Sequence, residues 1–317
     1  MANRIKEKYM AGKRYFDYPM LFLVIFLICF GLVMIYSTSS YKSTVTYGNS
    51  YHWLLRQAVA IVLGAVAMVV CCKLDYRIIK SEKFGNGCYW ASIVLLVLVL
   101  IIGAAKKGAV RWISIAGFQF QPSEVSKILV VIYLANRLSA NAHKIRTFKD
   151  SIVIVLPTVP IIALIVTQNL STALVVCSMI GVMLFVVSPR MKELILTAGG
   201  GIILLFVYLL TANSYRNERV QIWLHPESHK KGFQTMQALY AIGSGGIFGK
   251  GLGQSMQKMG FIPESHNDMI FSIICEELGL FGAVCLILVF VALIFRMLLI
   301  ALNTEDLFGS LVVIGFM

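Results

Sequence analysis

Residues 268–302 read DMIFSIICEELGLFGAVCLILVFVALIFRMLLIAL, in which one aspartate leads into a long apolar run. The run exceeds the ~20 residues that an α-helix needs to cross a ~30 Å hydrocarbon core. Lipid offers the backbone no other hydrogen-bonding partners, so the run is expected to be helical. A long polar loop, residues 214–267, precedes it. Asp268 is therefore expected where water meets the edge of the bilayer.

The composition is that of a membrane protein. Apolar residues make up 58% of the 317 residues and charged residues only 14%, and the mean hydropathy is +0.81. These values lie far from those of a soluble globular domain. The net charge of +13 comes from Lys and Arg residues in short segments between apolar runs. This pattern indicates membrane topology rather than nucleic-acid binding, so no nucleic-acid partner is expected.

Eight segments are long enough to span a bilayer, which predicts an all-α polytopic membrane protein. A shorter apolar run, residues 307–317, is predicted to be a truncated ninth helix. We expect a single integral membrane domain over residues 1–317 with a truncated carboxyl end. The predicted full spans are residues 19–38, 53–72, 88–105, 121–138, 151–167, 170–187, 194–213 and 268–297.

Basic residues predict the orientation. They gather before the first span and in the loops after the second, fourth and sixth spans. Short cytoplasmic loops carry such an excess, so the amino terminus is expected in the cytoplasm and the loop 214–267 outside it. No small-residue cleavage motif follows the first span, which is therefore expected to be uncleaved. The seven cysteines lie in or beside apolar runs, and no Cys/His cluster has zinc spacing, so neither a disulfide framework nor a zinc site is expected.

Ionisable residues inside spans are costly and usually mark a function or a pairing need. Glu124 and Lys127 lie three residues apart at the start of the fourth span, where they can pair with each other or with a third charge. Pro122 and Glu124 also suit an ordinary helix start. Glu276 and Glu277 are expected to face the protein interior, either for function or only to hold helices together by hydrogen bonds.

The glycine run in the long loop and Asp268 at its end can each be interpreted in a functional or a structural way. The glycine run from Gly243 to Gly253, with Lys250, offers amides and an ammonium for phosphate oxygens, or simply flexible or re-entrant backbone. Asp268 could act chemically or only cap the following helix, as Asn267 could.

Several stretches together resemble the SEDS family (shape, elongation, division and sporulation), which includes FtsW and RodA. The run FIPESHNDMIF at 261–271, continuing to EELG at 276–279, resembles the family signature, with wording closer to FtsW than to RodA. Arg111 and Trp112, the FQPSE run at 120–124 with Lys127, and the glycine run precede it in the family's order.

The resemblance implies a peptidoglycan glycosyltransferase of the bacterial cytoplasmic membrane. Such an enzyme polymerises lipid II into a nascent glycan strand and releases undecaprenyl diphosphate, in cell division or cell-shape maintenance. The family's essential acidic residue falls on Asp268, which would act as general base in an inverting displacement. Supporting residues would be Lys127, Glu124, His266 and Glu264. Substrate or diphosphate would contact Arg111, Arg216, Arg219, Lys250, Lys258, Gln121, Ser123, Gly245 and Gly246.

The resemblance also implies partners and leaves some points open. A class B penicillin-binding transpeptidase and other divisome or elongasome proteins would be partners, and Mg²⁺ or Mn²⁺ would be the cofactor to test. The family typically has ten spans and often a Pro and an Asp where this chain has Gln168, Asn169 and Leu170, so no catalytic role is assigned to that turn. Two other hypotheses are a lipid II flippase, although no internal repeat is evident, and a non-catalytic divisome scaffold.

Overall fold

A computed structural model shows a helical protein in which six segments are long and apolar enough to cross a membrane. It describes residues 16–106, 109–115, 118–145, 147–188, 193, 196, 199–200, 221–229 and 232–317. The six segments are Tyr18–Tyr47 (α2), His52–Lys73 (α3), Glu82–Ile102 (α5), Lys149–Gln168, Leu170–Val187 (α9) and Ile270–Asn303 (α13).

These six segments correspond to six of the eight predicted spans. Predicted span 121–138 is a helix, α6 (Pro122–Asn141), but Glu124, Lys127 and Arg137 give it too many charges to join the six. Predicted span 194–213 lies mostly outside the described residues. The structure therefore confirms a polytopic helical membrane protein, while the count of eight spans and a ninth stays a prediction.

Local sequence explains where several helices begin and end. Asp17 caps α2 by accepting a hydrogen bond from the Met20 amide at 2.8 Å, and Gly48 ends the helix in the left-handed conformation. The Lys149–Gln168 segment joins α7 (Phe148–Val155), η2 (Leu156–Thr158) and α8 (Val159–Gln168). Its start is fixed by a capping box, in which Thr147 and Asp150 each bond the other's backbone.

The contacts group the chain into two compact units, each described here by itself. Unit 1 comprises residues 1–65 and 222–296, and unit 2 comprises residues 66–221 and 297–317. The expectation of a single membrane domain over the whole chain stays a prediction.

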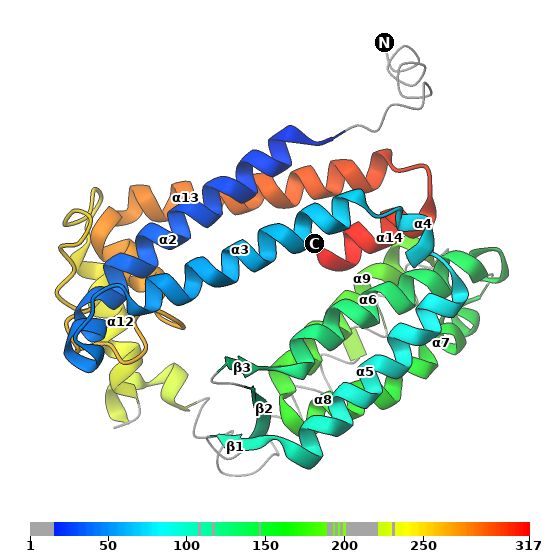
Figure 1. The fold of residues 1–317 in the computed structure, drawn as a ribbon, viewed down its shortest axis with the longest axis horizontal. Helices are drawn as coiled ribbons and strands as arrows, with labels where there is room; N and C mark the ends of the chain where they lie inside the picture. Colours follow the sequence, from blue (N-terminus) through cyan, green and yellow to red (C-terminus); the bar gives the residue numbers. More distant parts are fainter. Residues whose placement is uncertain are drawn as a thin grey trace. The chain divides into compact units, whose positions relative to one another are not determined.

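In unit 1, α2 lies beside α13 (Figure 1), and Met34 packs on Ile274 and Leu286 between them. The loop predicted at 214–267 contains an additional helix, α12 (Phe233–Ser244), and the turn η3 (Pro226–Ser228). A second small core joins α12 to the start of α13 through Ala241 and Ile273. The loop is thus folded over much of its described length rather than irregular.

Helix α13 is interrupted at Gly279, which has φ 70° and ψ −171°. The interruption leaves some backbone amides and carbonyls of α13 without partners inside the helix. Residues 246–251 provide the missing hydrogen-bond partners. Amides of Leu280 and Phe281 donate to carbonyls in this loop at 2.9 and 3.0 Å, and two loop amides donate to the carbonyls of Glu276 and Glu277, each at 2.9 Å. Four backbone hydrogen bonds therefore hold the glycine loop on the break, which we call the α13 break.

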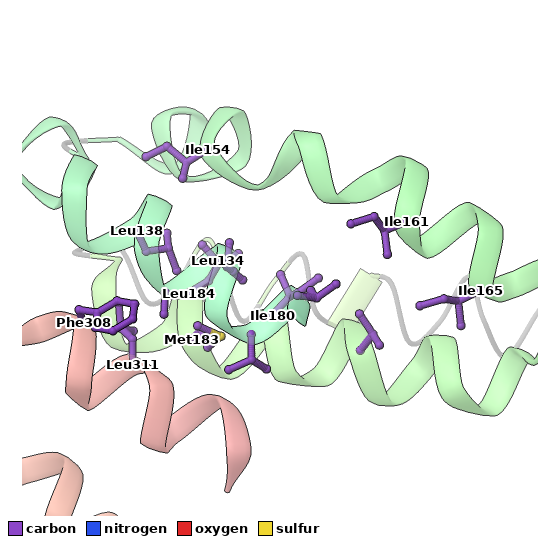
Figure 2. Packing of buried hydrophobic residues seen from close by; sticks show 14 of the residues in the cluster. Leu134, Leu138, Ile154, Ile161, Ile165, Ile180, Met183, Leu184, Phe308 and Leu311 are labelled. Atoms are coloured by element: carbon purple, nitrogen blue, oxygen red, sulfur yellow. The ribbon is translucent and has the colours of Figure 1, made fainter. Parts of the chain in front are cut away.

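In unit 2, α5, α6, α8 and α9 pack around one apolar core together with α14 (Leu307–Phe316). Figure 2 shows Phe308 and Leu311 of α14 against the side chains of Leu134, Met183 and Leu184. A short helix, α4 (Tyr76–Ile79), and the turn η1 (Ala142–Lys144) also belong to this unit.

A small antiparallel sheet lies between α5 and α6, which the all-α prediction did not include. Its three strands, in the order β1, β2, β3, are Ala104–Lys106, Ala109–Ile115 and Phe118–Phe120. Ile113 pairs with Phe120 across β2 and β3. The last strand ends at Phe120, two residues before α6 begins at Pro122 (Figure 1).

Candidate functional site

Asp268 lies two residues before α13 begins at Ile270, and its side chain is exposed. Among the described residues, its carboxylate accepts no hydrogen bond and forms no ion pair. The carboxylate therefore does not cap the helix, which was the structural alternative for this residue. An accessible and unpaired carboxylate at the start of a membrane span is free to accept a proton.

A tight turn holds the segment that carries Asp268. Glu264 adopts φ 56°, which is unusual for a residue other than glycine. Its backbone carbonyl accepts from the Asn267 amide at 3.0 Å, and its carboxylate accepts from the Asn267 side chain, also at 3.0 Å. Ser265 donates to the carbonyl of Thr38 at 3.3 Å and so ties the turn to α2.

His266 is buried inside this turn rather than placed at its surface. Its ring lies 4.8 Å from that of Trp53, and neither ring nitrogen has a hydrogen-bond partner among the described residues. Burial lowers the pKa of His266 below its ordinary value, and the charge of Lys42 lowers it further, while Glu264 opposes the shift. His266 is thus held neutral, and its predicted part in proton transfer stays a prediction.

The two glutamates of α13 are fully buried, in agreement with their predicted inward orientation. Glu276 pairs with Lys250 at 2.7 Å and also accepts hydrogen bonds from Ser255 and from the Met256 amide. Glu277 pairs with Lys258 at 2.7 Å, and Ser37 of α2 donates to both of its oxygens at 2.7 Å. Each glutamate thus binds a lysine of the preceding loop.

These contacts bear on the residues expected to hold diphosphate. Lys258 is only 5% exposed and already neutralised by Glu277, whereas Lys250 keeps 35% of its side chain exposed. The glycine run, including Gly245 and Gly246, packs against α13 through the α13 break. Diphosphate binding by these four residues stays a prediction, and their observed contacts are within unit 1.

Two further predicted supporting residues, Glu124 and Lys127, lie in unit 2. Pro122 is at the start of α6, and Glu124 and Lys127 form an ion pair of 2.8 Å on its first turns. Gln121 donates to the buried hydroxyl of Ser123 at 3.0 Å. Lys127 and Asp268 belong to different units, so their predicted pairing stays a prediction.

The three arginines predicted to hold diphosphate lie on β2 or outside the described residues. Arg111 is on β2, whereas Arg216 and Arg219 lie outside the described residues. Their diphosphate contacts stay predictions.

A group of α2 residues was missed from the sequence. Ser37 completes the Lys258–Glu277 pair, and hydroxyl residues from Tyr36 to Thr44 line a cavity beside it. The signal was present, because the stretch STSSYKST at 37–44 is unusually polar for a helix that is apolar before it.

Comparison with known proteins agrees with this architecture. Residues 18–317 match the profile of the FtsW, RodA and SpoVE cell cycle proteins. The chain belongs to this family. A probable peptidoglycan glycosyltransferase FtsW from Geobacter metallireducens is 36% identical over 310 residues, which cover 95% of this chain and 81% of the relative. Stage V sporulation protein E from Bacillus subtilis is 35% identical over 309 residues, covering 94% of this chain and 82% of the relative.

Two solved structures have a fold similar to that of this chain. A structure described as structural coordination of polymerization and crosslinking by a peptidoglycan synthase complex has a TM-score of 0.75 and 28% identity, covering 96% of this chain and 83% of that one. The rod shape determining protein RodA of Thermus thermophilus has a TM-score of 0.65 and 26% identity, covering 95% and 80%. The relatives named FtsW agree with the FtsW-like wording of the signature.

Proposed function

We propose that this protein is a peptidoglycan glycosyltransferase that polymerises lipid II into glycan strands and releases undecaprenyl diphosphate. The observation that carries the proposal is the carboxylate of Asp268 just before α13, which is exposed and has no partner among the described residues. The names of the FtsW relatives support the reaction class. A lipid-linked donor suits a group at the end of a membrane span, because its reactive sugar stays at the membrane surface.

In the proposed reaction, the Asp268 carboxylate takes the proton of the acceptor sugar's 4-hydroxyl. The hydroxyl oxygen then attacks the anomeric carbon of the donor as the bond from that carbon to the diphosphate breaks. One displacement inverts the anomeric centre, which converts an α-linked donor to a β-linked product without a covalent enzyme intermediate. The leaving diphosphate carries away the negative charge.

Other residues support the proposal with less direct evidence. The Glu124–Lys127 pair would orient or polarise Asp268, and Arg111, Arg216 and Arg219 would hold the diphosphate. The described residues contain no group of three His, Cys, Asp or Glu side chains that could hold a metal ion. A divalent cation such as Mg²⁺ or Mn²⁺ would then be held by one or two carboxylates together with the diphosphate of the substrate, and the polymerisation assay with and without added metal tests for it.

The membrane setting and partners follow from the same proposal. The six apolar segments place the protein in a membrane as a multi-pass protein, and peptidoglycan synthesis would place it in the bacterial cytoplasmic membrane with the amino terminus inside. One similar structure is of a complex that both polymerises and crosslinks. A class B penicillin-binding transpeptidase is accordingly the proposed partner, within the divisome or elongasome.

The test is polymerisation of labelled lipid II by the protein reconstituted with its transpeptidase in liposomes. We expect Asp268→Asn and Asp268→Ala to lower the rate by about 10²–10⁴-fold, since each removes a general base. Glu305→Gln is the control, because it neutralises an exposed carboxylate elsewhere in the chain.

The same experiment separates the two alternatives. Lipid II movement across the membrane that survives Asp268→Ala, without polymer, would identify a flippase. Transpeptidase recruitment without polymer from the wild-type protein would identify a scaffold. Polymerisation by Asp268→Asn at the wild-type rate would refute the general-base assignment.

A further inference from the structure

A cavity of about 580 Å³ lies in unit 1 between the carboxyl-terminal half of α2 and residues 252–259. This volume is within the range of about 300–1,000 Å³ that is usual for small-molecule sites. Its wall on α2 carries five hydroxyl-bearing residues between Val33 and Val45, and its wall on the loop combines Lys258 with Leu252, Gly253 and Met259. The residues that carry the argument are Tyr36, Ser37, Ser40, Tyr41, Thr44 and Lys258.

The hydroxyl groups on this face are arranged to accept hydrogen bonds from a ligand. Thr44 donates its own proton to the Ser40 carbonyl at 2.9 Å, and Ser40 donates to the Ser37 carbonyl at 3.4 Å. Because each proton is already used within the helix, the lone pairs of the oxygens remain for incoming O–H or N–H groups.

The same wall also offers flat apolar surfaces. Tyr41 is 45% exposed and Tyr36 is 38% exposed. Tyr36 is held by stacking on Tyr51, with ring centroids 5.5 Å apart and planes 15° from parallel. Aromatic rings present large, rigid contact surface to a ligand at a low cost in conformational entropy.

The charges at the cavity cancel. The Lys258 ammonium is 2.7 Å from the fully buried Glu277 carboxylate and 3.1 Å from Ser37. A diphosphate or other strong anion would have to compete with that carboxylate and would be repelled by it. A neutral ligand meets no such penalty, and it can still accept a hydrogen bond from the third Lys258 proton.

A sugar ring fits these three properties. Its hydroxyls donate to the free oxygens of the wall, its C–H face packs on tyrosine, and it carries no charge. We propose that this cavity binds a neutral sugar unit of a glycan chain, with Ser40, Tyr41, Thr44 and Lys258 as its contacts.

This assignment rests on the proposed function, which supplies the glycan. The cavity is also linked to the turn that carries Asp268. Ser37 on its wall adjoins Thr38, whose carbonyl accepts the hydrogen bond from Ser265, three residues before Asp268. A sugar bound in the cavity would therefore be held by the same part of α2 that anchors this turn.

The test measures binding of a soluble N-acetylglucosamine tetrasaccharide to the protein in nanodiscs by calorimetry. Ser40→Trp fills the cavity and should weaken binding by at least about ten-fold, because both the stacking surface and the acceptors become inaccessible. Thr46→Trp is the matched control, since Thr46 is exposed on the same helix and does not line the cavity.

Two double variants with smaller changes keep the test valid if Ser40→Trp fails to fold. The double variant Tyr41→Leu, Thr44→Val removes one aromatic ring and two hydroxyls, while Tyr47→Leu, Thr46→Val removes the same groups outside the cavity. We expect only the first pair to weaken tetrasaccharide binding, and the thermal unfolding midpoint of each double variant shows whether it is folded.

Several outcomes would overturn the assignment. These are no tetrasaccharide binding by the wild-type protein, equal binding by Ser40→Trp and Thr46→Trp, or displacement of bound tetrasaccharide by undecaprenyl phosphate at lower concentration than by free sugar. The last result would make the cavity a lipid site.

The outcome for the proposed function is separate. Asp268→Asn should keep tetrasaccharide binding and lose polymerisation. Polymerisation by Ser40→Trp at the wild-type rate refutes the sugar site alone, whereas tetrasaccharide binding without any polymer from the wild-type protein refutes the proposed reaction alone.

Discussion

At the residue scale, unit 1 places its carboxylates in contrasting environments. Glu276 and Glu277 are buried and paired, whereas Asp268 is exposed and unpaired among the described residues. Burying a charge is costly unless a partner compensates it, so the paired glutamates are suited to structure and the free aspartate to chemistry.

The buried His266 makes stability depend on pH. Its folded-state pKa lies below the ordinary value of 6.5, chiefly through burial and then through Lys42, with Glu264 opposing. The unfolded chain therefore binds the proton more readily, and stability is full above about pH 6.5 and falls as the pH drops below it. His266→Phe should reduce this loss, because the ring against Trp53 is kept and no hydrogen bond is removed.

The measurement is the thermal unfolding midpoint in detergent between pH 7.5 and pH 5. His143→Phe is the control, since His143 is exposed. An equal fall in midpoint for the wild-type protein and His266→Phe would show that His266 does not titrate in this range.

The residues of the candidate site were only partly predictable. Asp268 could be found because it ends a recognisable motif at the start of an apolar run. The environment of Lys258 could not, because its partners Glu277 and Ser37 are distant in sequence. A lysine in a polar loop indicates a solvated charge or an anion site equally well when its partner is unknown.

At the element scale, the two lysine pairs differ in burial and should differ in energy. Lys258→Met leaves the Glu277 charge buried without its cation, which costs about 3–5 kcal/mol in comparable buried pairs. Adding Glu277→Met should restore most of that loss, because neither charge then remains. Lys250→Met should cost less than Lys258→Met, since Lys250 is partly exposed and water can replace it.

A double-mutant cycle of unfolding free energies in detergent checks this expectation. Equal destabilisation by Lys258→Met and Lys250→Met would show that the difference in burial has no energetic effect. A double variant no more stable than Lys258→Met would show that the unpaired Glu277 charge is not the cause of the loss.

The α13 break predicts a strong requirement for glycine at position 279. A Cβ there would overlap the backbone of Ile247 and Gly249, and its φ and ψ are nearly restricted to glycine. Gly279→Ala should therefore lower the unfolding free energy by roughly 3 kcal/mol or more. Gly48→Ala also requires positive φ but meets open space, so it should cost only about 1–2 kcal/mol.

Unfolding in detergent measures both variants, with circular dichroism to confirm helix content. Equal losses for Gly279→Ala and Gly48→Ala would mean that close contact at the break contributes nothing beyond the backbone conformation.

The helices were largely predictable, and the break was not. Long apolar runs indicate spans because the bilayer fixes the length and forces backbone hydrogen bonding. A glycine in an apolar span is typical of close helix approach, but the close neighbour of Gly279 is a loop. Nothing in the run itself distinguishes these two possibilities, because the partners of the break lie at residues 246–251. The sheet at residues 104–120 was likewise obscured by its short strands.

At the scale of the whole molecule, the chain builds two units from discontinuous segments. Unit 2 is completed by α14, whose Phe308 and Leu311 are almost fully buried against α6 and α9 (Figure 2). Helices in lipid associate largely by close packing, so such contacts hold the unit together. Sequence alone did not reveal this division, because it depends on contacts between distant segments.

A cavity in this core should loosen unit 2 selectively. Leu311→Ala removes a fully buried side chain and should cost about 2–5 kcal/mol. Hydrogen exchange followed by mass spectrometry should then be faster in α6, α9 and α14 and unchanged in α2. Leu302→Ala is the control, since Leu302 is 72% exposed. Faster exchange in both units to the same extent would show that they unfold as one.

The α13 break also has a consequence for biosynthesis. The amides and carbonyls that satisfy it belong to residues 246–251, which leave the ribosome before residues 276–281. An interrupted helix that enters lipid without partners would expose polar backbone to hydrocarbon. The order of translation avoids this, because the stabilising loop is always made first and is available when the discontinuous helix is inserted.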